Sequence, residues 1–206
     1  MYLLMHAVLN KGKVIAGVAI GAAVAYFAIA VLVLPGAYIP ALAPPRPEPV
    51  VTDVSVSNST ISLGESFTLL VNATNQGDHA DRQIVSIAFP NVTSTDGIVT
   101  VQEENFKQSP VFIKAGTPIG SGYVGTQQMV RAQYPSVEIF SSPWQKGESF
   151  SIALSVKPAQ EGRFVFFVKA IGFPHNGDQA HWPSGGTLDH QNEYVSVYSV
   201  NVMTKA

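Results

Sequence analysis

The sequence predicts a mainly-β protein, an antiparallel β-sandwich that follows one N-terminal transmembrane helix. Residues 14–34 form an apolar run without a single charged residue. At about 1.5 Å per residue, a helix of this length covers roughly 30 Å, which is enough to cross the hydrocarbon core of a bilayer. Beyond residue 49, short apolar stretches alternate with turn-forming residues, and no helical repeat of useful length occurs. Short strands separated by turns are typical of a sandwich, and the remaining chain is long enough for one core.

The charges on either side of the apolar run predict its orientation. Lys11 and Lys13 precede it, whereas Arg46 on the far side is offset by Glu48. Because positive residues stay on the cytoplasmic side, residues 1–13 are expected in the cytoplasm. The chain would then cross the cell membrane once, with its C-terminal domain in the extracellular or pseudoperiplasmic space. A cleaved signal peptide is the alternative, but its apolar region would be unusually long and its one suitable cleavage site is followed by proline.

The outer part is expected to begin with a linker and continue as one domain. Residues 35–49 are rich in proline and should run extended over at most about 45 Å. Residues 50–206 form the domain. Its expected strands, apart from the two in the next paragraph, are residues 51–56, 67–74, 83–89, a short stretch after Pro110, 137–140 and 193–202.

The stretch 144–170 is expected to hold the domain together. Apolar and polar residues alternate from residue 149 to 157, the pattern of a strand with one buried face. Residues 158–162 contain proline and glycine and predict a tight turn, so the stretch is interpreted as a hairpin. The return strand, residues 163–171, contains the contiguous apolar run 164–168, which predicts a central strand with apolar surroundings on both faces.

Two segments are too long and irregular for ordinary turns. Residues 110–134 and the loop 172–192 are rich in glycine and proline, and excursions of this kind are usually functional or docked against something. Phe173 and Trp182 in the second segment are interpreted as interface anchors, because large aromatic side chains bury much area on binding.

Composition excludes several function classes. The chain has no cysteine, so disulfides, thiolate zinc sites and blue-copper centres are impossible. Its formal net charge of −2 offers no basic footprint for nucleic acid. Neither a nucleophile elbow nor a phosphate-binding loop occurs, and the acidic residues Asp96, Glu103 and Glu104 are expected in a solvated loop. Three sequons, at Asn58, Asn72 and Asn91, are candidates for glycosylation.

Histidines are the remaining candidates for binding a metal ion. His79 follows the second expected strand, and His175, His181 and His190 lie in the loop 172–192. In a sandwich these two loops are expected at one end, where the chain enters. Neutral imidazoles there could bind copper or zinc. Their spacing matches no standard ligand motif, so they are favoured as exposed or subunit-contacting residues and stay weak metal candidates.

Four short motifs resemble a known family. They are residues 109–114 (SPVFIK), 119–122 (IGSG), 146–150 (KGESF) and 162–164 (GRF). Their order and spacing over residues 50–172 are similar to the first cupredoxin-like domain of the B subunit of copper membrane monooxygenases. These enzymes are the ammonia and particulate methane monooxygenases, and a short B subunit is typical of the archaeal ammonia-oxidising branch.

The resemblance implies a fold, partners and a role. The domain would be a cupredoxin-like sandwich beside the multi-spanning subunits A and C, in the bilayer and in a trimer of protomers. Ammonia would be oxidised to hydroxylamine at copper sites in those partner subunits. The family's copper-binding His-x-His falls on Val165 and Phe167, which cannot ligate metal. A structural or assembly role on the outer face of the complex is therefore the expectation.

A different class of function fits the same pattern. An Ig-like extracellular sandwich with one anchor is also typical of a non-enzymatic module of the cell envelope, or of the type found at an archaellum stator. The sequons and the strand pattern fit it equally well.

Overall fold

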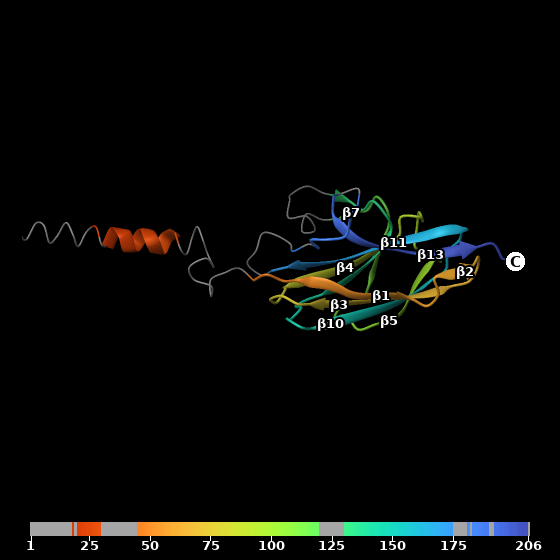
Figure 1. The fold of residues 1–206 in the computed structure, drawn as a ribbon, viewed down its shortest axis with the longest axis horizontal. Coiled ribbons are helices and arrows are strands. Elements are labelled where there is room, and N and C mark those ends of the chain that lie inside the picture. Colours follow the sequence, from red (N-terminus) through yellow and green to blue (C-terminus); the bar gives the residue numbers. More distant parts are fainter. Residues whose placement is uncertain are drawn as a thin grey trace, which may run out of the picture. The chain divides into compact units, whose positions relative to one another are not determined.

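A computed structural model describes residues 18, 20–29, 45–119, 130–174, 181, 183–189 and 192–205 (Figure 1). The chain divides into two units, Met1–Pro44 and Pro45–Ala206. In the first unit residues 20–28 are helical. The described residues contain no helix that is both long and apolar enough to cross a membrane. The expected transmembrane segment 14–34 falls only partly within them.

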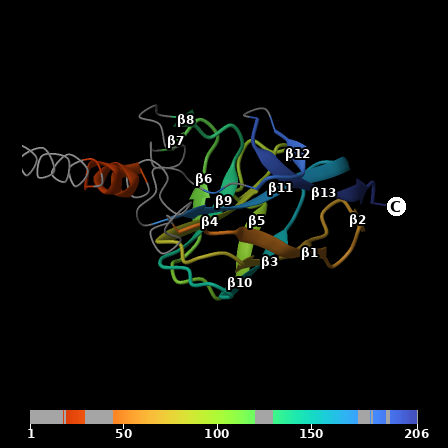
Figure 2. The same cartoon turned by 60° about the vertical axis from the view of Figure 1, so that its left-hand side comes forward.

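The second unit consists mainly of two packed sheets, which confirms the predicted mainly-β sandwich (Figures 1 and 2). The smaller sheet has the order β1-β3-β10-β5 and the larger sheet the order β12-β13-β11-β4-β9-β6. β2 pairs with β13 in parallel, and β7 and β8 form a separate ribbon. The bounds are β1 Pro49–Val56, β2 Thr60–Ser62, β3 Phe67–Asn75, β4 Arg82–Ala88, β5 Val99–Glu104, β6 Val111–Ile113, β7 Pro118–Ile119, β8 Val130–Arg131, β9 Ser136–Ser141, β10 Ser149–Val156, β11 Gly162–Phe173, β12 Thr187–Leu188 and β13 Tyr194–Met203.

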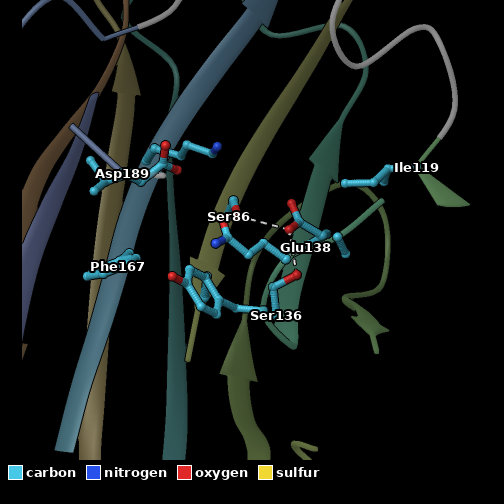
Figure 3. A pocket seen from close by; sticks show the side chains of 12 residues that line it. Ser86, Ile119, Ser136, Glu138, Phe167 and Asp189 are labelled. Carbon is cyan, nitrogen blue, oxygen red and sulfur yellow. Dashed lines mark hydrogen bonds between the residues drawn. The ribbon is translucent and has the colours of Figure 1, made fainter. Parts of the chain in front are cut away.

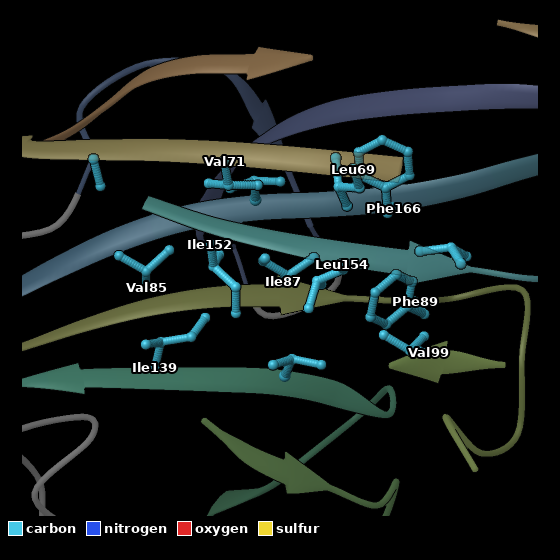
Figure 4. Close-up of a cluster of buried hydrophobic side chains, with 14 of the residues drawn as sticks. Leu69, Val71, Val85, Ile87, Phe89, Val99, Ile139, Ile152, Leu154 and Phe166 are labelled. Carbon is cyan, nitrogen blue, oxygen red and sulfur yellow. The ribbon is translucent and has the colours of Figure 1, made fainter. Parts of the chain in front are cut away.

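The core lies between the two sheets. β3 and β10 alternate strictly between buried and half-exposed residues, as the sequence pattern predicts for strands with one face in a core. Side chains from both sheets interdigitate there, and many are fully buried (Figure 4). Among them are Leu69, Val71, Ile87, Ile139, Ile152, Leu154 and Phe166.

The expected hairpin at 149–171 is wrong in its pairing. β10 pairs with β3 and β5 in the smaller sheet, whereas β11 pairs with β13 and β4 in the larger one. The turn at 157–161 therefore carries the chain from one sheet to the other. Both strands have a strongly apolar face, and stacking the two faces across the core buries them against each other. A hairpin would have placed the strands side by side in one sheet.

β11 is central in its sheet, as predicted, but the apolar run within it divides between two faces. Phe164, Phe166 and Val168 point into the core and are at most 5% exposed. Val165 and Phe167 lie on the other face and are half-buried. The positions that align with the family's His-x-His are therefore on the outer face of the larger sheet. Phe167 is not a core residue, and the large stabilisation expected of a buried aromatic belongs to Phe166.

The end of the Pro-rich stretch belongs to the sandwich. Arg46 donates its backbone N–H to Asp78 Oδ2 at 3.0 Å and accepts the Asp78 N–H at 2.9 Å. Glu48 N donates to Asn75 Oδ1 at 3.0 Å. Gly77 permits this approach, since a Cβ there would lie 2.3 Å from the Arg46 carbonyl oxygen. The linker expected over 35–49 is thus shortened by its last five residues. We call this end of the sandwich the proximal end and the opposite end, near the C-terminus, the distal end.

β5 was missed by the sequence pattern. Glu103 and Glu104, expected in a loop, lie on this edge strand and pair with β10. Only Val99 on it is buried, so the apolar signal was too short to predict a strand. Asp96 does lie outside the strands, in the turn before β5.

Candidate functional site

A polar cluster on the outer face of the larger sheet is the first candidate site (Figure 3). Glu138 on β9 is only 5% exposed, and its Oε1 accepts hydrogen bonds from two serine hydroxyls. Ser86 on β4 donates at 2.8 Å and Ser136 at 2.7 Å. Ile119 of β7 and Ala132, just after β8, line the same cavity. A carboxylate with hydroxyl donors is stable when buried because its charge is hydrogen-bonded.

The opposite wall of this cavity carries further charge. Lys169 on β11 forms an ion pair with Glu193, whose backbone N–H donates to Asp189 Oδ1 at 3.0 Å. Tyr134 packs edge-on against Phe167 with ring centroids 5.9 Å apart. Burial, followed by the charge of Asp189, raises the pKa of the Tyr134 hydroxyl, so this group stays protonated at neutral pH.

The cavity is too small for a substrate. Its volume of about 50 Å³ holds a few water molecules, since one water needs roughly 10–15 Å³ measured this way. The cluster's hydrogen bonds link β4 with β9, and its ion pair links β11 with the segment before β13. Sequence reasoning did not single out these residues. The available signal was a single polar residue between two apolar neighbours in each of three strands, namely Ser86, Glu138 and Lys169.

A larger groove lies at the proximal end. It has a volume of about 440 Å³ and runs between β1 and the strands β11 and β13, with Val168 and Ala170 among its apolar lining. Glu48, His181 and Ser196 are polar residues along it. Its size is within the range of ligand pockets, and its lining combines apolar and polar groups.

His181 is held at the edge of this groove by backbone hydrogen bonds. Its N–H donates to the Gly172 carbonyl at 2.7 Å and its carbonyl accepts the Gly172 N–H at 3.0 Å. Burial, followed by the charge of Arg46, lowers the pKa of His181 below 6.5, against the opposite effect of Glu48. His79 is exposed, in the loop between β3 and β4 that packs against residues 46–48.

Three of the other predicted residues, His175, His190 and Trp182, lie outside the described residues. Within the described part of the chain, no group of three or more histidine or carboxylate side chains is placed to hold a metal ion. Phe173, the last residue of β11, is half-buried, and its carbonyl accepts the Asp81 N–H at 2.9 Å.

The sequons differ in their surroundings. Asn58 is exposed in the bend between β1 and β2. Asn72 lies within β3, which is paired on both sides, and its Nδ2 contacts Asp53 Oδ2 at 3.4 Å. Asn91 is exposed just after β4, and its Oδ1 accepts the Val165 N–H at 2.7 Å.

The depressed pKa of His181 predicts a loss of stability on mild acidification. The unfolded chain binds the imidazole proton at a higher pH than the folded chain does. The folded state therefore has its full stability above about pH 6.5, the ordinary pKa of histidine. It loses stability as the pH falls from there towards the lower pKa of His181 in the folded state. We expect His181→Gln to flatten the dependence of the urea midpoint on pH between about 7 and 5. An unchanged slope would contradict this.

Glu148 provides the control because it titrates in a different range. Burial raises the pKa of its carboxyl, but the Lys107 ammonium, 2.8 Å from Oε1, and the Gln145 N–H, 2.9 Å from Oε2, outweigh burial and lower it below 4.5. Its stabilisation is present above that pH and is lost below it. Glu148→Gln should therefore leave the slope between pH 7 and 5 unchanged.

Comparisons with known proteins find similarity of structure only. No family model and no curated protein sequence matches the chain. The cohesin module of a family 33 glycoside hydrolase from Clostridium perfringens aligns with a TM-score of 0.39 at 13% identity, over 77% of this chain and 98% of that module. A CARDB domain from Pyrococcus furiosus aligns with a TM-score of 0.36 at 10% identity, over 76% of this chain and 89% of that domain.

A β-glucosidase from Listeria innocua aligns with a TM-score of 0.38 at 14% identity. The alignment covers 79% of this chain and 17% of that enzyme.

Proposed function

We propose that the chain is a membrane-anchored, non-enzymatic subunit whose β-sandwich stands outside the cell and works by binding partner proteins. The observation that carries the proposal is the attachment of residues 45–48 to the sandwich, because the backbone groups of Arg46 and Glu48 form hydrogen bonds with backbone and side-chain groups of residues 75–78. The sandwich is thereby fixed to the chain immediately after residue 44. In the first unit, the large hydrophobic side chains of the described residues are exposed: Val18, Ile20, Val24, Tyr26, Phe27 and Ile29. Such a surface is suited to lipid or to other membrane helices.

The short tether restricts where the sandwich can act. Only residues 35–44 separate the apolar run from the sandwich unit. An extended Pro-rich chain of this length spans about 30 Å at roughly 3.1 Å per residue. The proximal end, with its groove of about 440 Å³, would therefore stay near the membrane surface. We infer that the partners are membrane proteins which bind this end.

The specific form of the proposal is a B subunit of an ammonia monooxygenase-type complex. It rests on the resemblance of residues 50–172 alone. In this form the chain covers the outer face of subunits A and C, in a trimer of protomers, and ammonia is converted to hydroxylamine in those partners. The sandwich would be cupredoxin-like in fold and would have an assembly role.

Copper does not fit this chain at the family's position. Val165 and Phe167 have no lone pair to donate, and they lie on the outer face of β11, where Phe167 packs against Tyr134. Their neighbours Phe164 and Phe166 are core residues. We therefore assign any copper in such a complex to its partner subunits and derive no step through copper here.

An Ig-like module of the cell envelope, or of the archaellum-stator type, is the second candidate. The outer face of the smaller sheet favours it, because this face carries small polar side chains in register across β3 and β10. Thr74 pairs with Ser149, with 2.7 Å between their hydroxyl oxygens, Asn72 with Ser151 and Thr68 with Ser155. The four strands of this sheet contain no lysine or arginine, and a face of small polar side chains is suited to contact with another protein or glycan layer.

Extraction in mild detergent separates the two forms. We expect an affinity-tagged full chain to retain two multi-spanning membrane proteins if it is the monooxygenase subunit. Retention of surface-layer protein instead would favour the envelope module. Recovery of the tagged chain alone, under conditions that preserve other membrane complexes, would contradict both.

The two tryptophans give a matched test of docking. Trp182→Ala is expected to reduce recovery of the partners while the melting temperature of the chain barely changes, because an anchor contributes to the interface and not to the core. Trp144→Ala is the control. Trp144 is fully buried and donates its Nε1–H to the Glu148 carbonyl at 2.7 Å, so its loss should lower the melting temperature. If Trp182→Ala destabilises the isolated chain and leaves assembly intact, the docking role is wrong.

A further inference from the structure

We propose that Asn91 is an N-glycosylation site and that the first sugar of its glycan lies in an adjoining cleft at the distal end of the sandwich. The inference rests on the proposed function in one respect, that the sandwich is exported from the cytoplasm. It concerns the end of the domain opposite to the one assigned to membrane partners.

Asn91 is anchored in a way that leaves the reactive nitrogen available. The pairing of β4 with β11 ends at Ala88 and Phe167. Beyond that point β4 offers no backbone acceptor to Val165, and the Asn91 carboxamide takes its place. Asn91 Oδ1 accepts the Val165 N–H at 2.7 Å, which fixes the plane of the amide and its exposed position. Glycosylation substitutes Nδ2 and leaves Oδ1 as an acceptor, so this hydrogen bond can persist.

The sequon itself lines a cleft. Asn91, Val92 and Thr93 form one side, and the turn between β10 and β11 forms the other. The volume is about 220 Å³, below the roughly 300 Å³ of the smallest pockets for drug-sized ligands, so the cleft suits a single ring. Its remaining lining residues are Ile98, Ala159, Gln160, Glu161, Gly162, Arg163 and Phe164.

The chemistry of this lining suits a sugar. The half-buried side chains of Val92 and Ile98, which pack against the core, provide an apolar surface for the C–H face of a pyranose ring. Two neighbouring side chains are held in place by hydrogen bonds to the end of the chain. Arg163 Nε donates to Ser199 Oγ at 2.9 Å, and Glu161 Oε2 accepts the Thr204 hydroxyl at 3.0 Å. Guanidinium, carboxylate and amide groups beside an apolar surface can bind ring hydroxyls and an acetamido group.

The other two sequons have no such surroundings. Asn72 lies in a strand paired on both sides, and its Nδ2 contacts Asp53. Asn58 is exposed, but it does not line any of the three described cavities. A glycan at Asn58 would extend into solvent, which makes this sequon the natural control.

The modification is an ordinary glycosyl transfer. A phosphate-activated sugar donor loses its C1–O bond to phosphate, and a C1–Nδ2 bond forms on Asn91. Nδ2 releases one proton, and the donor's phosphate leaves with the electron pair of the broken bond.

The test uses the full chain, produced in a host that glycosylates exported proteins. Peptide mapping by mass spectrometry after enzymatic release in ¹⁸O-water should mark Asn91, and Thr93→Ala should abolish the mark. The glycan is then trimmed to its first sugar with an endoglycosidase. We expect this one-sugar form to melt about 2–4 °C above Thr93→Ala made in the same host, a shift of the size typical of one modest interaction in a chain of this length. In a host without N-glycosylation, the wild-type chain and Thr93→Ala should have the same melting temperature.

Removal of the Asn58 sequon by Thr60→Ala provides the comparison. It should remove any glycan at Asn58 without changing the difference in melting temperature between the one-sugar form and Thr93→Ala. An unoccupied Asn91 beside an occupied Asn58 would overturn the inference while export of the sandwich stands. If all three sequons are empty, both the inference and the proposed location fail. If Asn91 is glycosylated but the one-sugar form has the same melting temperature as Thr93→Ala, the sugar does not lie in the cleft and that part of the inference is wrong.

Discussion

Phe166→Ala is expected to lower the free energy of unfolding by about 3–5 kcal/mol, as for other buried aromatic residues replaced by alanine. Phe166 is fully buried in the core, beside Leu69 (Figure 4). Its ring stacks on Tyr198 with centroids 5.6 Å apart and lies 6.4 Å from the ring of Phe67. Truncation removes contacts to both sheets and leaves a cavity that the surrounding strands cannot close. Urea denaturation of the detergent-solubilised full chain measures the effect.

The adjacent Phe167→Ala is the matched control. Phe167 has the same side chain on the same strand but faces the outer side, where it is half-buried against Tyr134. We expect a smaller loss, about 1–2 kcal/mol, because less apolar area is removed from contact. A larger loss at 167 than at 166 would mean that the two faces of β11 are assigned the wrong way round.

Asn75→Ala is expected to lower the free energy of unfolding by roughly 3–5 kcal/mol through lost hydrogen bonds. Asn75 is fully buried. Its Oδ1 accepts the N–H groups of Glu48 and Gly77 at 3.0 and 3.2 Å, and its Nδ2 donates to the carbonyls of Asp78 and Trp144 at 2.6 and 3.1 Å. Each such bond contributes about 1 kcal/mol, and a buried group left without a partner costs more. Urea denaturation again measures the loss.

The same substitution should loosen the proximal end. Since Asn75 ties Glu48 to two loops, limited proteolysis of Asn75→Ala should cut near residues 45–48 faster than in the wild type. Asn72→Ala, on the same strand but with one side-chain contact at 3.4 Å to Asp53, should cost less than about 1 kcal/mol and leave the cleavage rate unchanged. Equal effects of the two variants would show that the amide network does not hold the proximal end.

Strands were predictable where a local pattern was strong. The alternation in residues 149–156 and 67–75 matches β10 and β3 closely, because one face of each strand is in the core and the other is not. β5 and the short strands β2, β7, β8 and β12 were missed. Each has too few apolar residues for a pattern to emerge, and each is defined by its pairing with a neighbour.

The candidate sites were less predictable than the strands. The sequence drew attention to histidines and to the position of the family's copper ligands, whereas the buried hydrogen-bond clusters that the structure shows around Glu138 and Asn75 were not expected. Nothing local marks these two as buried. Glu138 meets Ser86 across 52 residues, and Asn75 meets Trp144 across 69. Only the tertiary packing of distant strands and loops brings Ser86 and Trp144 within hydrogen-bonding distance of them.

By itself the sequence determined that this is a mainly-β chain with a long apolar run before it, because side-chain periodicity and hydropathy are local properties. It also determined that β11 is central, since an apolar run of that kind is unstable at a solvated edge. The tertiary structure alone decided that β10 and β11 stack in different sheets, that Phe166 rather than Phe167 fills the core, and that residues 45–48 belong to the sandwich. The reason is physical: both faces of β11 carry apolar side chains, so the local sequence does not say which face is buried. Which face is buried depends on the sheet that closes over it.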